Sequence, residues 1–179
     1  MRTNDLPVQI PIEAPPHNLE AEQCVLGALL RDINHTLCRQ ALDDLSKEMF
    51  YSRSHGKLFL LLKTMAENKQ TVDLITTTNL LESQGDLDDV GGFAYVAQLI
   101  KHLPSIANTL AYTQIVIQTY TNRMIMSVVC EANEQAHRNI SPSEVLSNLE
   151  TNLKNMVDHD TGKQMKHLSD VGEKWLDCL

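Results

Sequence analysis

The stretch from Ser105 to His137 constrains the fold of this chain more than any other feature. It contains no glycine or proline, and its apolar pattern persists for about nine turns, whereas most globular helices have three or four. Two apolar stripes run along it: Leu110, Ile117, Tyr120, Met124 and Val128 in the first, and Ile125, Val129, Ala132 and Ala136 in the second. The pattern predicts one long helix with apolar residues on more than one side.

A second helix is predicted directly after this stretch. In the residues "SPSEVL" at 141–146, Ser141 is the N-cap, a proline takes the first helical position and Glu144 the third, which is the arrangement of a capping box. Its apolar side consists of Val145, Leu149, Leu153 and Met156. The two helices are expected to form a hairpin over residues 104–160.

A two-helix hairpin buries only the sides that face each other, so this one leaves apolar surface uncovered. We therefore predict that it associates with a second copy or with a partner protein. The residues predicted to mediate self-association are Leu110, Ile117, Tyr120, Met124, Ile125, Val128, Val129, Leu149, Leu153 and Met156. The alternative is that the uncovered side folds back on the rest of the chain.

Residues 17–103 predict a globular head made of five short helices, packed as a small orthogonal bundle. The preceding residues 1–16 hold four of the six prolines and are expected to form an extended tail. Asn18 is the predicted cap of the first helix, and Glu20 and Glu22 lie in its first turn, where the helix dipole favours negative charge. The apolar residues expected on one side of that helix are Leu19, Leu26, Leu29, Leu30 and Ile33.

The other four helices of the head are predicted from similar signals. The second carries Leu37, Ala41 and Leu45, and the third follows the turn "MFYSRSH" at 49–55 with Leu58, Phe59, Leu62 and Met65 facing inward. The fourth is capped by Asp73 or Thr71 and ends at Gly85, which we expect to adopt positive φ. The fifth follows Gly91 and Gly92, and its inward residues are Phe93, Val96, Ala97 and Ile100.

Composition and charge favour an all-α protein and disfavour several classes of function. Aromatic residues make up only 4% of the chain, and the net charge is -8 with no dense lysine or arginine cluster, which is unfavourable for contact with phosphate backbones. The cysteines Cys24, Cys38, Cys130 and Cys178 form no CxxC pair, and those within helical patterns are expected to be buried in a reducing compartment. Apolar runs are too short for a membrane helix, which favours a cytoplasmic location without membrane contact.

Residues 161–179 predict a linker followed by the start of a short amphipathic helix. Val171, Trp175 and Leu179 lie on one face of it, and a helix this short is expected to be ordered only when it is docked. Docking on its own hairpin is the alternative to docking on a partner. Because the apolar pattern is still running at Leu179, we expect a further domain downstream.

The sequence offers no convincing catalytic, cofactor or metal site. Neither Gly56-Lys57 nor Gly162-Lys163 continues as a phosphate-binding loop. "HTLC" at 35–38 places a histidine and a cysteine one helical turn apart but lacks two further zinc ligands, and the acidic run 85–92 lacks the spacing of a calcium loop. His55 is interpreted as a helix-start or packing histidine, and no histidine is paired by spacing with both a nucleophile and an acid.

Several stretches together resemble the N-terminal domain of the bacterial replicative DNA helicase of the DnaB type. They are "PPHNLEAEQCVLGALL" (15–30), "MFYSRSHGKLF" (49–59), "VDLITTTNLLESQGDLDDVGGFAYVAQL" (72–99) and "PSIANTLAYTQIVIQ" (104–118). They occur in the order and spacing of that family and are far more specific than a short motif.

The resemblance implies a helical head and a hairpin that pairs between subunits, so that six copies form a collar of three dimers. It implies docking of the C-terminal domain of primase on this collar. It also implies that a helicase loader acts on the helicase, largely through regions absent from this chain. ATP, Mg²⁺ and single-stranded DNA would be bound by a C-terminal motor domain, whose Walker loop is absent from these residues. Catalytic, cofactor-binding and metal-binding residues are therefore not expected here.

Three other functions fit parts of the sequence. A stand-alone helical adaptor would share the fold without any motor, and a DNA-binding helical regulator would insert a helix into a groove. A phosphotransfer protein would need an exposed histidine in the middle of a helix, and His137, followed by Arg138, comes closest.

Overall fold

The computed structural model describes residues 14–138 and 140–154, and every regular element in these two ranges is helical. The head contains α1 (Leu19–Arg31), α2 (Thr36–Asp44), α3 (Arg53–Glu67), α4 (Leu74–Gln84), α5 (Gly92–His102) and the short 3₁₀ helices η1 (Lys47–Met49) and η2 (Ile106–Asn108). The long helix α6 (Thr109–His137) follows, and a last helix spans 142–154. The predicted all-α class is confirmed. The predicted tail up to residue 13, Met156, Cys178 and the linker helix with Val171, Trp175 and Leu179 lie outside the described residues.

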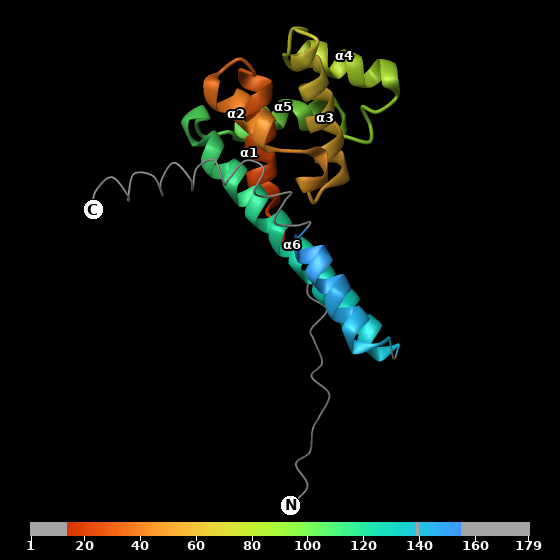
Figure 1. Ribbon diagram of the computed structural model, residues 1–179. Coiled ribbons are helices and arrows are strands. Elements are labelled where there is room, and N and C mark those ends of the chain that lie inside the picture. Colours follow the sequence, from red (N-terminus) through yellow and green to blue (C-terminus); the bar gives the residue numbers. More distant parts are fainter. Residues whose placement is uncertain (1–13, 139, 155–179) are drawn as a thin grey trace, which may run out of the picture.

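The molecule consists of a head and a projecting hairpin (Figure 1). Helices α1 to α5 gather at one end, and α6 runs away from them. The helix 142–154, called the return helix below, lies beside the second half of α6 and runs back toward the head. The predicted hairpin is therefore present in the described part of the chain.

The ends of the head helices follow from local sequence. Asn18 Oδ1 accepts a hydrogen bond from Ala21 N at 2.9 Å, which satisfies a free amide in the first turn of α1. Asp73 caps α4 and forms a reciprocal capping box with Thr76. Gly85 ends α4 with a φ of 76°, a left-handed conformation that favours glycine. The predicted caps at Asn18 and Asp73 and the predicted positive φ of Gly85 are confirmed.

Helix α1 lies at the centre of the head. Val25, Leu26 and Leu29 are completely buried in the main apolar cluster. Helix α5 crosses α1 so closely at Gly27 that a Cβ added there would overlap the carbonyl oxygen of Leu99. A glycine at this position therefore permits the contact between the two backbones.

Two predicted inward residues of the head are exposed instead. Leu19 and Phe93 are 40% and 48% exposed, although each has the spacing of its helix's apolar side. Both lie in the first turn of a helix, before burial begins at Ala21 in α1 and at Val96 in α5. Periodicity predicts the direction of a side chain, but not whether a neighbouring element extends far enough to cover it.

Helix α6 belongs partly to the head and partly to the hairpin. Its first half contributes the fully buried residues Thr109, Thr113 and Val116, and Val116 is part of the same apolar cluster as α1. Tyr112, Ile115 and Ile117 pack against this cluster. The alternative in which the uncovered side of α6 folds back on the head is thus correct for this half of the helix. No described helix is long and apolar enough to cross a membrane.

Candidate functional site

Polar side chains link the two helices of the hairpin. Asn148 Nδ2 donates to Gln135 Oε1, and Asn152 Nδ2 donates to Glu131 Oε2, both at 3.2 Å. At the start of the return helix, Glu144 N donates to Ser141 Oγ at 3.3 Å, which confirms the predicted cap. These bonds fix how the return helix is aligned along α6.

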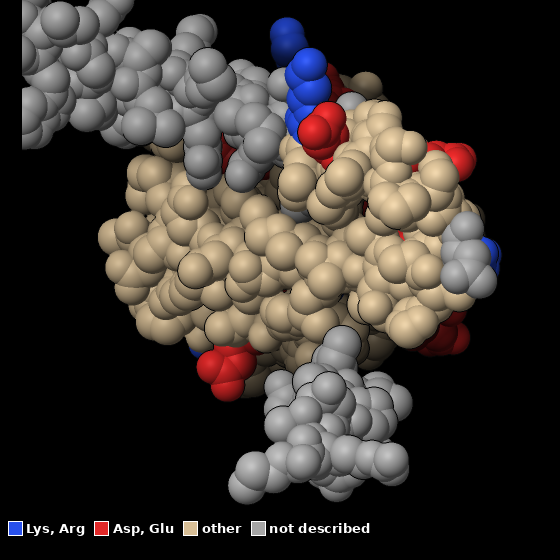
Figure 2. Space-filling model, turned by 60° about the horizontal axis from the view of Figure 1, so that its bottom comes forward, with Lys and Arg blue, Asp and Glu red and all other residues tan. Residues whose placement is uncertain are grey.

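The hairpin exposes large apolar side chains. Ile125 and Met126 are each 45% exposed and Val129 is 57% exposed on α6, and Leu146 and Leu153 are exposed on the return helix. From Leu103 to Cys130, Arg123 is the only lysine, arginine, aspartate or glutamate, whereas the rest of the described hairpin carries Glu131, Glu134, Arg138, Glu144, Glu150 and Lys154. Figure 2 shows a broad face of the molecule on which charged residues lie only near the edges. The uncharged part of α6 from Met124 to Cys130, which exposes Ile125, Met126 and Val129, is typical of an interface with another protein.

The structure divides the residues predicted for self-association into three groups. Ile125, Val129 and Leu153 are exposed. Val128 is buried, and Ile117 packs against the core of the head. The half-buried remainder consists of Leu110, Tyr120, Met124 and Leu149. The role of this set in self-association stays a prediction, and Met126 and Leu146 are exposed neighbours that the sequence analysis did not name.

Arg123 marks the point at which α6 leaves the head. Its Nη1 donates to the carbonyl oxygen of Pro16 at 2.8 Å, and its Nη2 donates to that of Met49 at 2.7 Å. The guanidinium carbon lies 5.7 Å from the ring centres of both Tyr51 and Tyr120. A single side chain of the hairpin thus holds two separate segments of the head, and sequence analysis did not identify it.

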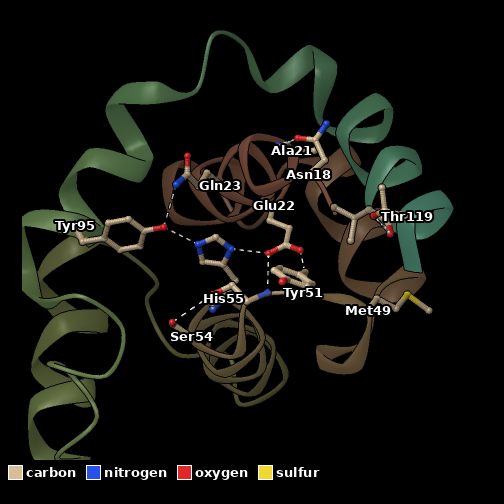
Figure 3. A network of polar contacts seen from close by, with 12 residues as sticks. Asn18, Ala21, Glu22, Gln23, Met49, Tyr51, Ser54, His55, Tyr95 and Thr119 are labelled. Carbon is tan, nitrogen blue, oxygen red and sulfur yellow. Dashed lines mark hydrogen bonds and ion pairs between the residues drawn. The ribbon is translucent and has the colours of Figure 1, made fainter. Parts of the chain in front are cut away.

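A buried polar network joins three helices of the head (Figure 3). Glu22 in α1 is 1% exposed, and its carboxylate accepts hydrogen bonds from Tyr51 N at 2.6 Å and Ser52 N at 3.3 Å. The same carboxylate lies 2.6 Å from His55 Nδ1, and His55 Nε2 lies 2.5 Å from the hydroxyl of Tyr95 in α5. The sequence predicted Glu22 only as a favourable charge in the first turn and His55 only as a helix-start or packing residue, and neither prediction included the bond between them.

Glu22, His55 and the Tyr95 hydroxyl follow one another in the order of a catalytic triad. Unlike a catalytic triad, they are not accessible to a substrate. Glu22 and His55 are both almost fully buried among the residues of the core. Gln23 Nε2 donates to the Tyr95 hydroxyl at 3.1 Å, so the oxygen that would act as nucleophile is held by two partners. Buried polar groups need such partners, and the network therefore joins α1, α3 and α5 as a structural element.

The remaining polar residues that drew attention in the sequence have local partners. His35 caps α2, and Cys38 Sγ donates to Ala28 O at 3.5 Å, so the "HTLC" pair does not form a shared site. Burial raises the pKa of Cys38 to about 11. Cys130 is exposed, contrary to the prediction of a buried cysteine, because it lies on the projecting half of α6.

In the acidic turn, Asp86 and Asp89 both pair with Lys57, at 2.6 and 2.9 Å.

The head and hairpin together define a class: all-helical proteins in which a small globular head carries a projecting hairpin with exposed apolar side chains. A family model described as the DnaB-like helicase N-terminal domain matches residues 14–118. The chain belongs to this family, as the sequence resemblance predicted.

Similar proteins agree with this assignment. The chain is 41% identical over 114 residues to a protein of Treponema pallidum (strain Nichols) described as replicative DNA helicase DnaB, covering 64% of this chain and 26% of that protein. It is 36% identical over 135 residues to the protein of the same description in Haemophilus influenzae, covering 73% of this chain and 27% of that protein. The chain thus spans about a quarter of the length of these relatives.

Solved structures show the same fold. The crystal structure of the N-terminal domain of DnaB helicase from Mycobacterium tuberculosis superposes with a TM-score of 0.72 at 24% identity, covering 79% of this chain and 99% of that chain. A DnaB-like replicative helicase, whose structure was described together with its interactions with primase, gives a TM-score of 0.63 at 20% identity over 85% of this chain and 35% of that chain.

Proposed function

We propose that this chain is the assembly and partner-docking domain of a hexameric replicative DNA helicase. Hairpins pair between two copies, and three such pairs form a collar that recruits primase to the replication fork. Unwinding, single-stranded DNA binding and the use of ATP and Mg²⁺ belong, in this proposal, to the motor domain of the full-length helicase. The proposal places the chain in the cytoplasm, and membership of the family supports the proposed role.

The exposed apolar surface of the hairpin is the observation that carries the proposal. Ile125 and Val129 are one turn apart on α6, and each leaves about half of its side chain in contact with solvent. Covering a large aliphatic side chain completely contributes about 1.5–3 kcal/mol. A second hairpin could cover this surface without any rearrangement of the head.

Analytical ultracentrifugation of an Ile125→Asp/Val129→Asp variant tests the pairing. Each copy contributes two aspartates, and these four side chains together remove about 3 kcal/mol of favourable burial, so the dissociation constant should rise about 100-fold. These exposed positions suit the test better than Val128, because an aspartate at Val128 would also disrupt the buried side of the hairpin.

Ile75→Asp provides the matched control. Ile75 is as exposed as Val129, at 57%, but it lies on α4 in the head. The control should sediment like the wild type. Unchanged sedimentation of the double variant, or wild-type chain that is monomeric at all concentrations, would contradict pairing through the hairpin.

Docking of primase needs a separate test. The structure of the DnaB-like helicase described with its primase interactions supports primase as the partner. Titration calorimetry with the C-terminal domain of primase from the same organism should show saturable binding to this chain. Absence of binding at concentrations that saturate the full-length helicase would remove primase docking from the proposal. A helicase loader is proposed as a further partner, to be tested in the same way.

The DNA-binding alternative predicts a helix with a basic face, which α6 does not have. Arg123 is the only basic residue in α6 before His137, and both of its donor groups are bonded to carbonyl oxygens. A gel shift with duplex DNA at low salt would favour this alternative over the assembly role.

A further inference from the structure

Helix α6 packs on the head along its first half, and this contact ends near Arg123. Helix α6 is buried on the head at Thr109, Thr113 and Val116, and its next buried residue is Val128 in the projecting half. Between them, Arg123 makes the last polar contacts that the described residues show between α6 and the head. Because α6 is continuous and contains no glycine or proline, a change in its angle to the head would tilt it as one rod, and the contact farthest along the helix resists such a tilt best.

Arg123 is well placed to prevent such a tilt. Its two donor groups reach carbonyl oxygens from two different segments, Pro16 before α1 and Met49 in η1. A planar guanidinium can hold both carbonyl groups in one fixed geometry, which a single hydrogen bond cannot do. Because both bonds come from one side chain of α6, a tilt of the helix would move that side chain relative to both carbonyl groups.

Aromatic rings reinforce this position. The guanidinium lies 5.7 Å from the ring of Tyr51 in the head and 5.7 Å from the ring of Tyr120 on α6. Tyr51 is itself stacked on His17, with ring centres 4.3 Å apart. A cation near an aromatic ring gains further attraction, so the rings favour the same orientation of the arginine side chain.

The segment 49–51, which Arg123 contacts at Met49, is also bound to the rest of the head. Tyr51 N donates to the Glu22 carboxylate at 2.6 Å, and Glu22 is bound to His55 in α3 (Figure 3). The turn after η1 is therefore tied to the buried network, and Met49 lies only two residues before Tyr51. Through the segment 49–51, Arg123 thus connects the hairpin to the buried network around Glu22.

We propose that Arg123 is a positioning residue that locks the angle between the hairpin and the head. The angle determines where the apolar face of the hairpin points, and therefore where the head of a second, paired copy lies. This consequence for assembly rests on the proposed function. The lock itself acts within one chain.

Distance measurements by electron paramagnetic resonance test the lock. Nitroxide labels are attached to unnatural amino acids at Asn79 on α4 and Asn133 near the end of α6, both exposed. Labelled chain is diluted with unlabelled chain, so that only distances within one molecule are recorded. Arg123→Ala should broaden the distance distribution and add a second population, whereas the wild type should give one narrow peak.

Arg138→Ala is the matched control, because Arg138 is also on the hairpin but is exposed and pairs only with Glu134 among the described ion pairs, at 3.6 Å. It should leave the distribution unchanged. Tyr51→Phe keeps the ring and should also leave it unchanged, while Tyr51→Ala should broaden it.

Two outcomes would overturn the proposal: an Arg123→Ala distribution as narrow as that of the wild type, or loss of cooperative unfolding of the head in that variant, which would make Arg123 a residue of general stability. Sedimentation reports on pairing and the distance distribution reports on the lock, so failure of the proposed function and failure of this inference are distinguishable.

Discussion

At the scale of single residues, the head places two neighbouring threonines of α4 in very different situations. Thr77 and Thr78 are both buried, but the Thr78 hydroxyl donates to Leu74 O at 2.8 Å. The Thr77 hydroxyl has no hydrogen-bond partner among the described residues. A buried hydroxyl without a partner costs free energy, and the cost disappears when a methyl group replaces it.

We therefore expect opposite effects from the same substitution at these two positions. Thr77→Val should leave the free energy of unfolding unchanged or raise it by about 1 kcal/mol, whereas Thr78→Val should lower it by about 1 kcal/mol. Urea unfolding followed by circular dichroism measures both, and each variant serves as the control for the other. Equal destabilisation by the two changes would mean that Thr77 has a partner.

Single residues also show what the sequence could and could not predict. The caps at Asn18 and Asp73 were predictable because a cap bonds to backbone only three residues away. Glu22 looked like one more favourable charge in a first turn, and its true partner, His55, is 33 residues further along the chain. Arg123 is more distant still from Pro16. Contacts of this kind depend on how helices cross, which periodicity does not determine.

At the scale of elements, the ends of the helices were more predictable than which of their residues are buried by neighbouring helices. The Phe93 position follows the apolar spacing of α5, yet α5 buries Val96 and Leu99 and leaves Phe93 exposed. The sequence correctly predicted that α6 has apolar residues on more than one side. It did not predict which part of α6 packs on the head and which part projects. The first half of α6 covers the head and its second half projects, because the head ends near Arg123.

The contribution of the Asp73 cap to the stability of α4 depends on pH. The Thr76 backbone amide donates to the Asp73 carboxylate at 2.8 Å, and this bond lowers the pKa of Asp73 below its ordinary value. Because the carboxylate binds a proton more weakly in the folded chain than in the unfolded chain, the cap's contribution is complete above the unfolded pKa of about 4 and is lost as the pH falls through the folded pKa.

Asp73→Asn isolates this contribution. Asparagine is also a good N-cap, but it does not titrate, so the variant should lose less stability than the wild type between about pH 5 and pH 3. Urea midpoints measured across this range supply the comparison, and other carboxylates affect both proteins equally. Parallel curves for the two proteins would show that the Asp73 cap does not contribute to acid sensitivity.

At the scale of the whole molecule, the head and the hairpin share one core. Val116 of α6 is fully buried in the cluster that contains Leu26 and Leu29 of α1, and α6 packs against both α1 and α2. The sequence analysis placed a boundary between head and hairpin at residues 103 and 104, and the boundary itself stays a prediction. The packing indicates that the first half of α6 is needed to complete the head.

Two shortened chains test this dependence. A chain ending at Leu103 loses Val116, Tyr112 and Ile115, and each large apolar side chain removed from a core costs about 1.5–3 kcal/mol, against a total stability of about 5–15 kcal/mol for a typical domain. We expect this chain to show no cooperative unfolding in urea. A chain ending at Arg138 keeps all of α6 and should unfold cooperatively, with a midpoint close to that of the full chain. Cooperative unfolding of the chain that ends at Leu103 would show that the head is complete without α6.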